Sequence, residues 1–175
     1  MEKNIEYLLE KMCNPQEEEA YKYADELAEI GGEEVLQRLI TLIKSEDKEC
    51  AFLAARSLSK IENNQEALDP LLEAIHEKDN KNQNGAFVQA LEGFDISSKF
   101  VDILRIYLFG NFKASTIAKS YLDYTEFDIT PRVIKKAEKH WNHFTNNSKQ
   151  DEAFELKKAE VEEMLSEMKS MFEEE

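Results

Sequence analysis

The sequence predicts an all-α protein, an α-solenoid of about four helical hairpins, from its composition and from an internal repeat. Hydrophobic residues make up 42% of the 175 residues and charged residues 34%, whereas five glycines and three prolines supply too few turns for a many-stranded β protein. Apolar residues recur at the spacing of amphipathic helices in a repeat of about 32 residues, and no segment alternates like a strand. We expect a single domain over residues 1–175.

The repeat is clearest in two consecutive segments, residues 19–47 and 50–79. Their first helices align at a shift of 31 residues, which places Ala24, Leu27 and Ile30 on Ala55, Leu58 and Ile61. Their second helices align at a shift of 32, because the turn gains one residue where Gly31 and Gly32 are replaced by Asn63 and Asn64. Each segment therefore predicts one helical hairpin.

Two further copies extend the array. A third copy occupies residues 85–109 and a degenerate fourth copy occupies 114–144, so four hairpins fill residues 17–144. Degeneracy is typical of the last unit in a repeat array. Pro70 and Pro131 fall in the first turns expected for two second helices, where the missing N–H of proline costs nothing.

A helix is expected on each side of the array, at residues 1–14 and at residues 148–173. Ser148 could cap the second of these, with Asp151 three residues further on. This helix carries a narrow apolar seam made of Phe154, Val161, Leu165, Met168 and Phe172. The seam predicts either a helix that covers the open face of the last hairpin or a contact with a partner or a second copy, so the chain is a monomer or a homodimer.

The net charge of −15 is concentrated at the two ends of the chain. Residues 1–34 hold eleven acidic and three basic side chains, and residues 151–175 hold ten acidic and three basic ones, whereas the middle is balanced. Nucleic-acid binding depends on clustered lysine and arginine, so this distribution argues against it. The acidic ends are either ordinary solvated helix surfaces or surfaces that attract a basic partner.

The two cysteines, Cys13 and Cys50, lie far apart in the sequence and within helical patterns. We therefore expect small buried thiols in a reducing compartment, with a disulfide between them as the alternative. Acidic residues interrupt the apolar ones in the first 14 residues, which excludes a secretory signal, and no apolar run has membrane length. The sequence therefore predicts a cytoplasmic protein without membrane contact.

The segments YADELAEIGGEEVLQRLITLIKSED and AARSLSKIENNQEALDPLLEAIHEKD resemble HEAT-like repeats of the short kind found in phycobilisome lyases. The resemblance covers residues 17–144 and implies a right-handed α-solenoid whose second helices form a concave, ligand-facing side. The side chains expected on that face run from acidic to basic along the chain and are Gln37, Thr41, Asp69, Glu73, Asp102, Arg105, Lys135, Lys136 and Lys139. Such a gradient would orient an extended peptide or a partner helix, although an ordinary solvated face is the alternative.

Two patterns suggest metal ions but fall short of a site. His140 and His143 have helical spacing, yet two ligands do not complete a metal centre. Residues 80–91 have the spacing of an EF-hand loop, but Leu91 stands where the loop needs glutamate, and amides replace most carboxylates. We expect no metal, no cofactor and a polar loop between repeats.

No catalytic residues are recognisable, because the sequence contains no nucleophile with its base, no P-loop and no dinucleotide fingerprint. We therefore expect a non-enzymatic interaction or scaffold module that binds a protein or peptide on the second-helix face, with a basic partner among the candidates. The alternative is a small acidic inhibitor or immunity-type protein that blocks a basic enzyme such as a toxin or nuclease.

Overall fold

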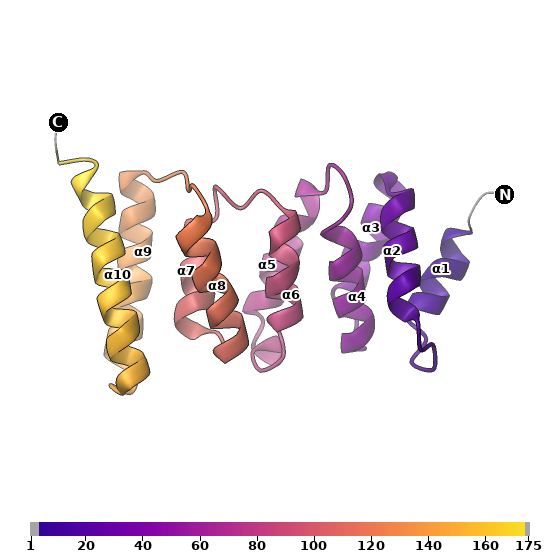
Figure 1. The fold of residues 1–175 in the computed structure, drawn as a ribbon, viewed down its shortest axis with the longest axis horizontal. Coiled ribbons are helices and arrows are strands. Elements are labelled where there is room, and N and C mark those ends of the chain that lie inside the picture. Colours follow the sequence, from indigo (N-terminus) through magenta and orange to yellow (C-terminus); the bar gives the residue numbers. More distant parts are fainter. Residues whose placement is uncertain (1–3, 174–175) are drawn as a thin grey trace. The chain divides into compact units, whose positions relative to one another are not determined.

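The structure is a computed structural model that describes residues 4–173, and these residues are helical with no strand among them (Figure 1). The predicted all-α fold class is confirmed. Packing of the Cα atoms divides the chain into unit 1, Met1–Asp95, and unit 2, Ile96–Glu175. The single domain expected over 1–175 stays a prediction.

Among its described residues, unit 1 contains six α-helices. The first lies within the helix expected at residues 1–14, and the other five lie close to helices expected from the repeat. Their bounds are α1 (Ile5–Met12), α2 (Ala20–Ile30), α3 (Gly32–Leu42), α4 (Lys48–Leu58), α5 (Leu68–His76) and α6 (Gly85–Ala90). Three short 3₁₀ helices lie between or after them: η1 (Gln65–Ala67), η2 (Lys78–Asn80) and η3 (Leu91–Gly93). Pro70 lies in the first turn of α5, as its position predicted.

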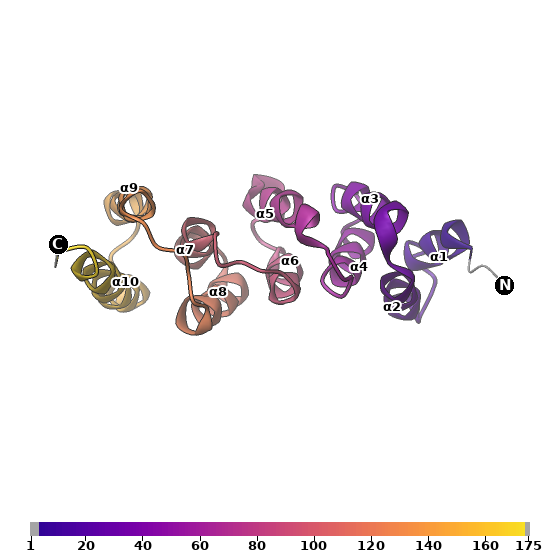
Figure 2. The same ribbon diagram turned by 90° about the horizontal axis from the view of Figure 1, so that it is seen from above.

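The helices of unit 1 form two layers (Figure 2). The first helices of the repeats, α2, α4 and α6, form the first-helix layer, and α3 and α5 form the second-helix layer. Helix α4 packs against α2, α3 and α6, so one helix joins both layers. The fully buried side chains of these helices include Leu27, Leu39, Leu58 and Leu71, which the apolar spacing predicted.

Buried amides close the turns of unit 1. The Asn64 amide donates hydrogen bonds to the carbonyl oxygens of Leu58, at 2.7 Å, and Gly93, at 3.1 Å, and so joins the end of α4 to η3. A Cβ atom on Gly93 would lie 1.9 Å from the carbonyl oxygen of Ser59. This close backbone approach therefore requires glycine at position 93.

The prediction of two free thiols is wrong, because Cys13 and Cys50 form a disulfide with their Cα atoms 4.7 Å apart. Helix α1 packs along α2, and α2 packs along α4, so the end of α1 lies over the first turn of α4. Only this stacking brings together two residues that are 37 positions apart. Disulfides are rare in the cytosol, so the cysteines no longer support the cytoplasmic prediction. Within residues 4–173, no helix is long and apolar enough to span a membrane.

Unit 2 contains α7 (Phe100–Phe109), α8 (Phe112–Tyr124), α9 (Pro131–Asn147) and α10 (Glu152–Ser170). Helices α7 and α9 form its second-helix layer, and α8 and α10 lie on the other side of them (Figure 2). Thr130 caps α9 through a hydrogen bond from the backbone N–H of Val133, and Pro131 occupies the first turn as predicted.

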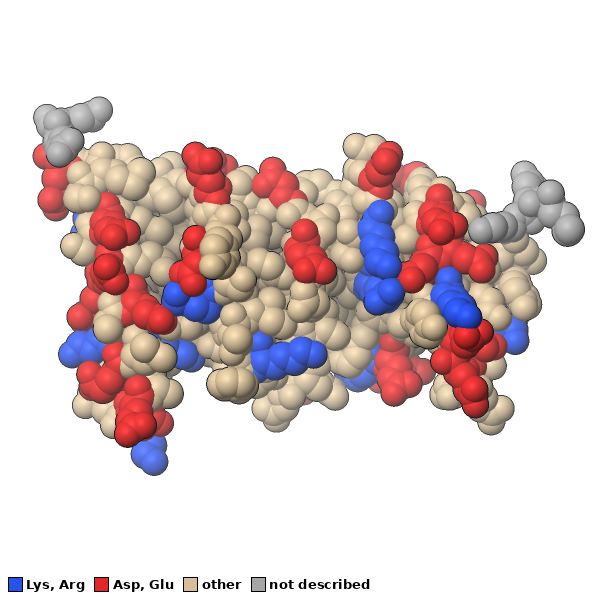
Figure 3. All heavy atoms as spheres, viewed as in Figure 1, with Lys and Arg blue, Asp and Glu red and all other residues tan. Residues whose placement is uncertain are grey.

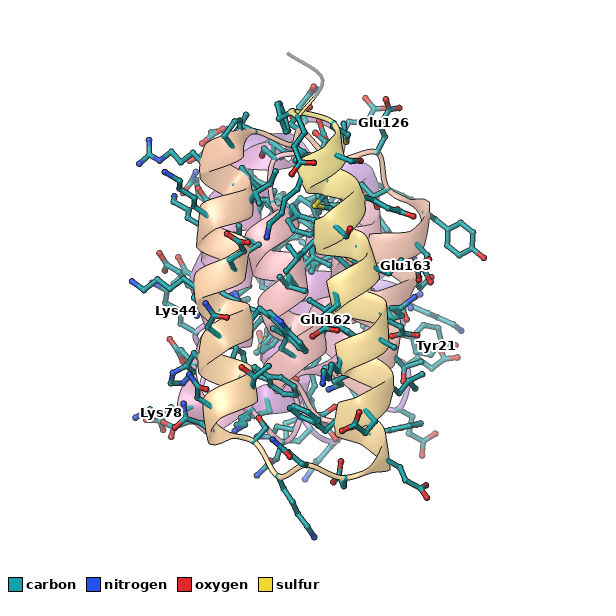
Figure 4. All side chains as sticks on the ribbon, turned by 90° about the vertical axis from the view of Figure 1, so that its left-hand side faces the viewer. Tyr21, Lys44, Lys78, Glu126, Glu162 and Glu163 are labelled. Carbon is teal, nitrogen blue, oxygen red and sulfur yellow. A yellow bond between two sulfur atoms is a disulfide. The ribbon has the colours of Figure 1, made fainter. Side chains whose placement is uncertain are left out.

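Helix α10 takes the place of a further first helix in unit 2 and packs along α9 (Figure 4). Phe154, Val161 and Leu165 of its seam are buried there, and the Phe154 ring stacks on Phe144 with the centroids 5.7 Å apart. Its cap is Asp151, which accepts a hydrogen bond from the N–H of Phe154, so the expected cap at Ser148 is wrong. An aspartate directly before the first helical residue outcompetes a serine three residues earlier.

Polar contacts fix α10 against α7. The Tyr107 hydroxyl donates a hydrogen bond to Glu160, and the Lys157 ammonium donates one to the carbonyl oxygen of Leu108 at 3.3 Å. Burial lowers the pKa of Lys157, whereas burial and the nearby Glu160 carboxylate raise the pKa of Tyr107. These contacts hold the terminal helix in one orientation on its own chain.

Candidate binding faces of the second helices

The second-helix layer of unit 1 exposes the four side chains that the sequence placed on a ligand-facing surface: Gln37, Thr41, Asp69 and Glu73. Gln37 on α3 donates hydrogen bonds to Glu33, at 3.0 Å, and to Glu66 of η1, at 2.7 Å. The second bond connects one repeat to the next across the face. We name this surface, formed by α3, η1 and α5, the unit 1 face.

The unit 1 face is acidic. Glu33, Glu66, Asp69 and Glu73 are all exposed on its elements. Arg38 of α3 binds Glu6 of α1 through two hydrogen bonds, one of them 2.9 Å long. These bonds lower the pKa of the Glu6 carboxyl. The positive charge of Arg38 is therefore already paired, and the carboxylates dominate the rest of the face.

The second-helix layer of unit 2 carries the remaining five predicted residues. Asp102 and Arg105 are half-buried on α7 with their charged atoms 3.7 Å apart. Lys135, Lys136 and Lys139 are exposed on α9, and none of them has an ion pair among residues 4–173. We name this surface, formed by α7 and α9, the unit 2 face. Its charge is opposite to that of the unit 1 face.

The positive charge of α9 is not neutralised by acidic side chains in the described part of the chain. The only acidic side chain of α9 is Glu138, and it forms a salt bridge with Lys169 of α10. Arg132 is also exposed and lacks an ion pair within the described part of the chain. Elsewhere acidic residues neutralise many cations, as Asp25 does for both Arg56 and Lys60. The cations of α9 are left for a ligand or for water.

A depression of about 480 Å³ lies between the start of α7 and α9. Among its lining residues are Lys99, Phe100, Val133, Lys136, Lys139 and His140. Burial lowers the pKa of the half-buried His140, and the positive charges of Arg105 and Lys139 lower it further. The depression is therefore lined by both cationic and apolar side chains, and we name it the α7–α9 depression.

The sequence placed Lys136 and Lys139 on the second-helix face but missed the depression itself. His140 was considered only as a metal ligand, and Lys99 was not singled out. Proximity of the start of α7 to the middle of α9 depends on tertiary packing, which helical spacing does not reveal. The near absence of acidic residues from α9 was the available signal.

Neither suggested metal pattern forms a ligand cluster. The amides of Asn80 and Asn84 donate hydrogen bonds, both 2.8 Å long, to the carbonyl oxygens of Ala74 and Ile75 at the end of α5. His143 is exposed and lies beside the Phe109 ring. Within the described residues, no three His, Cys, Asp or Glu side chains gather for a metal ion.

The seam of α10 divides between core and surface. Phe154, Val161 and Leu165 lie in the core of unit 2, whereas Met168 is half-buried and Phe172 is 41% exposed. On the side away from α9, Glu163 points outward (Figure 4). Acidic side chains gather over α10 in unit 2 and over α1 and α2 in unit 1 (Figure 3).

Alternating first and second helices in two layers define a helical-repeat protein. The family model for HEAT repeats matches residues 5–92, about half of the chain. The chain belongs to the HEAT-repeat family, and the resemblance noted in the sequence is confirmed. The comparisons with curated proteins and with solved structures find no match. HEAT repeats commonly serve as protein-interaction scaffolds and are generally non-enzymatic.

Proposed function

We propose that this chain is a protein-binding module that holds a protein or peptide on the faces of its second helices. The observation that carries the proposal is the unpaired positive charge of α9 in a chain with a net charge of −15. Isolated surface charges are common, but four clustered cations without counter-ions favour an acidic ligand.

The opposite charges of the two faces indicate a partner with two kinds of segment. A basic segment suits the unit 1 face, where Glu66 and Glu73 are exposed, and an acidic segment suits the unit 2 face. Complementary potentials set orientation and association rate more than affinity. The proposed partner is therefore a protein, or an extended peptide, whose charge changes sign along its length.

The test is a fluorescence-anisotropy titration of the whole chain with three labelled peptides: an acid-rich peptide, a lysine-rich peptide and one that joins both blocks. We expect the acid-rich peptide to bind the unit 2 face and the lysine-rich peptide to bind the unit 1 face, so the joined peptide should compete with both. The double change Lys135→Glu and Lys139→Glu should weaken binding of the acid-rich peptide by about tenfold and leave binding of the lysine-rich peptide unchanged. Glu73→Lys should weaken binding of the lysine-rich peptide and leave binding of the acid-rich peptide unchanged.

Matched controls lie away from the second helices. Lys158 on α10 and Glu18 before α2 are exposed and lie outside both faces. Lys158→Glu is therefore compared with Lys135→Glu alone, and Glu18→Lys with Glu73→Lys, so that each pair changes the net charge equally. Equal losses from face and control variants would mean that net charge alone drives binding, and would overturn the proposal. Binding of the lysine-rich peptide alone, lost with Glu18→Lys, would instead favour the acidic-inhibitor alternative.

A further inference from the structure

The α7–α9 depression has the size and lining of a pocket for part of a peptide. Its volume of about 480 Å³ lies within the range of ordinary ligand pockets and exceeds the need of a single inorganic anion. Both helices that form it belong to unit 2, and α7 packs directly against α9. Its walls are therefore fixed by the core of one unit.

Three of the residues that line the depression are apolar: Phe100, Val101 and Val133. Phe100 is buried and its ring contacts Phe127 edge to face, with the centroids 5.3 Å apart. Val101 and Val133 are half-buried at the same place, so part of each side chain faces the hollow. Aliphatic or aromatic side chains gain free energy in such a place in proportion to the apolar area that leaves water.

The rim of the depression is positively charged. Lys136 and Lys139 line it one turn apart on α9, and Lys99 lines it from the other side. Its acidic lining residue is Asp102, which forms an ion pair with Arg105. Carboxylates next to an apolar side chain would meet the ammonium groups of Lys136 and Lys139.

We infer that the α7–α9 depression is a specificity pocket that receives one apolar side chain flanked by aspartate or glutamate in an acidic peptide segment. This inference rests on the proposed function and names the ligand chemistry of its unit 2 face. Acidic residues over α10 and the net charge of −15 oppose a long polyanion such as nucleic acid. A short acidic segment meets the cations of α9 with less repulsion.

The test compares two labelled peptides that differ at one position: a central leucine flanked by glutamates, and the same sequence with serine in place of leucine. Titration of the whole chain should give about tenfold tighter binding of the leucine peptide, because one buried apolar side chain discriminates by that order. A pocket that contributes nothing would give equal affinities.

Neighbouring lysines supply a matched pair of variants. Lys135 and Lys136 are both exposed on α9, but only Lys136 lines the depression. Lys136→Glu should reduce leucine-peptide affinity several-fold more than Lys135→Glu does. Val133→Ser should reduce the preference for leucine over serine while leaving the affinity of the serine peptide unchanged. Helical circular dichroism of each variant verifies that it is folded.

The outcomes separate this inference from the proposed function. Equal binding of both peptides, with equal losses from Lys135→Glu and Lys136→Glu, would overturn the pocket and leave a diffuse cationic face. Failure of both acidic peptides to bind would overturn the pocket and the proposed role of the unit 2 face together. Preference for leucine that survives Val133→Ser and Lys136→Glu would place the apolar contact elsewhere and contradict the inference.

Discussion

Asn63 and Gly31 share a backbone φ of +58° at corresponding turns between the first and second helices of consecutive repeats. Left-handed backbone is costly for most residues, whereas glycine has no Cβ to clash and asparagine tolerates the conformation. Gly31 combines this φ with a ψ of −153°, a region that essentially only glycine adopts. The two turns therefore share a positive φ, which each reaches with a residue that tolerates it.

Asn63→Val should destabilise the chain by about 1–2 kcal/mol, because a β-branched side chain is poorly tolerated at positive φ. Asn63→Gly should leave the free energy of unfolding unchanged or slightly altered, because glycine adopts this φ freely. Urea unfolding followed by circular dichroism measures both. Similar stabilities for the valine and glycine variants would contradict the left-handed turn.

The disulfide should stabilise the chain by about 3–4 kcal/mol, since it closes a long loop in the unfolded chain. Thiol titration should find no reactive cysteine in the untreated protein and two after reduction and unfolding. The double variant Cys13→Ser and Cys50→Ala should lower the urea midpoint as reduction does and should no longer respond to reductant. Two free thiols in the untreated protein would contradict the bond.

Val161→Asp should destabilise unit 2 by about 3 kcal/mol or more, because it buries an unpaired charge at a fully buried position of α10. Fluorescence of the single tryptophan, Trp141 on α9, reports the urea unfolding of this unit. Ser166→Asp is the control, because Ser166 is exposed on the same helix. Sedimentation should give the same mass for both variants.

This experiment also separates the two roles first considered for the seam. If the seam were instead a dimer contact, Val161→Asp would lower the sedimenting mass and leave the unfolding of unit 2 unchanged. The buried positions of Phe154 and Leu165 favour the covering role. The exposed Phe172 lies beyond the end of α10 and takes no part in this core.

Binding of an acidic peptide to unit 2 should tighten several-fold as the pH falls from about 7 to about 5. Burial and the positive Arg105 and Lys139 lower the pKa of His140, while Asp102 opposes this and His143 adds to it. Bound carboxylates would favour the imidazolium, so binding takes up a proton. His140→Gln should remove this pH dependence, whereas His143→Gln should retain most of it.

The lowered pKa of His140 also makes folding stability depend on pH, in the opposite direction to peptide binding: stability decreases as the pH falls. The pKa of His140 is lower in the folded chain than its ordinary value of 6.5, so the unfolded chain binds the proton more readily. Its contribution to stability is complete above pH 6.5 and is lost as the pH falls toward the folded-state pKa. Weaker peptide binding to wild-type protein at the lower pH would contradict the role assigned to His140.

Local sequence signals predicted the helices well. Proline at positions 70 and 131 marked helix starts because its effect on backbone geometry is local. Burial was harder to predict, as Ile30 and Ile61 illustrate: the two align in the repeat, yet Ile30 is 36% exposed and Ile61 is buried. Ile61 lies near Gly31, against the turn of the preceding hairpin. Among the described residues, the first hairpin follows α1 instead of another hairpin.

Features that depend on stacking between repeats could not be predicted from the sequence. The disulfide requires α1 to lie against the start of α4, and the α7–α9 depression requires the start of α7 to meet α9. Periodicity within one helix carries no information about either contact. Exposure of the second-helix side chains was predictable, because it follows from the apolar stripe on the opposite side of each helix.

The most direct test of the central claim is backbone amide NMR of the whole chain during titration with the peptide that joins a basic and an acidic block. The account predicts shift changes in α3, η1 and α5 of unit 1 and in α7 and α9 of unit 2, including Val133 and Lys136. Changes confined to α2, α4, α8 and α10, with the second helices unaffected, would contradict binding on the second-helix faces.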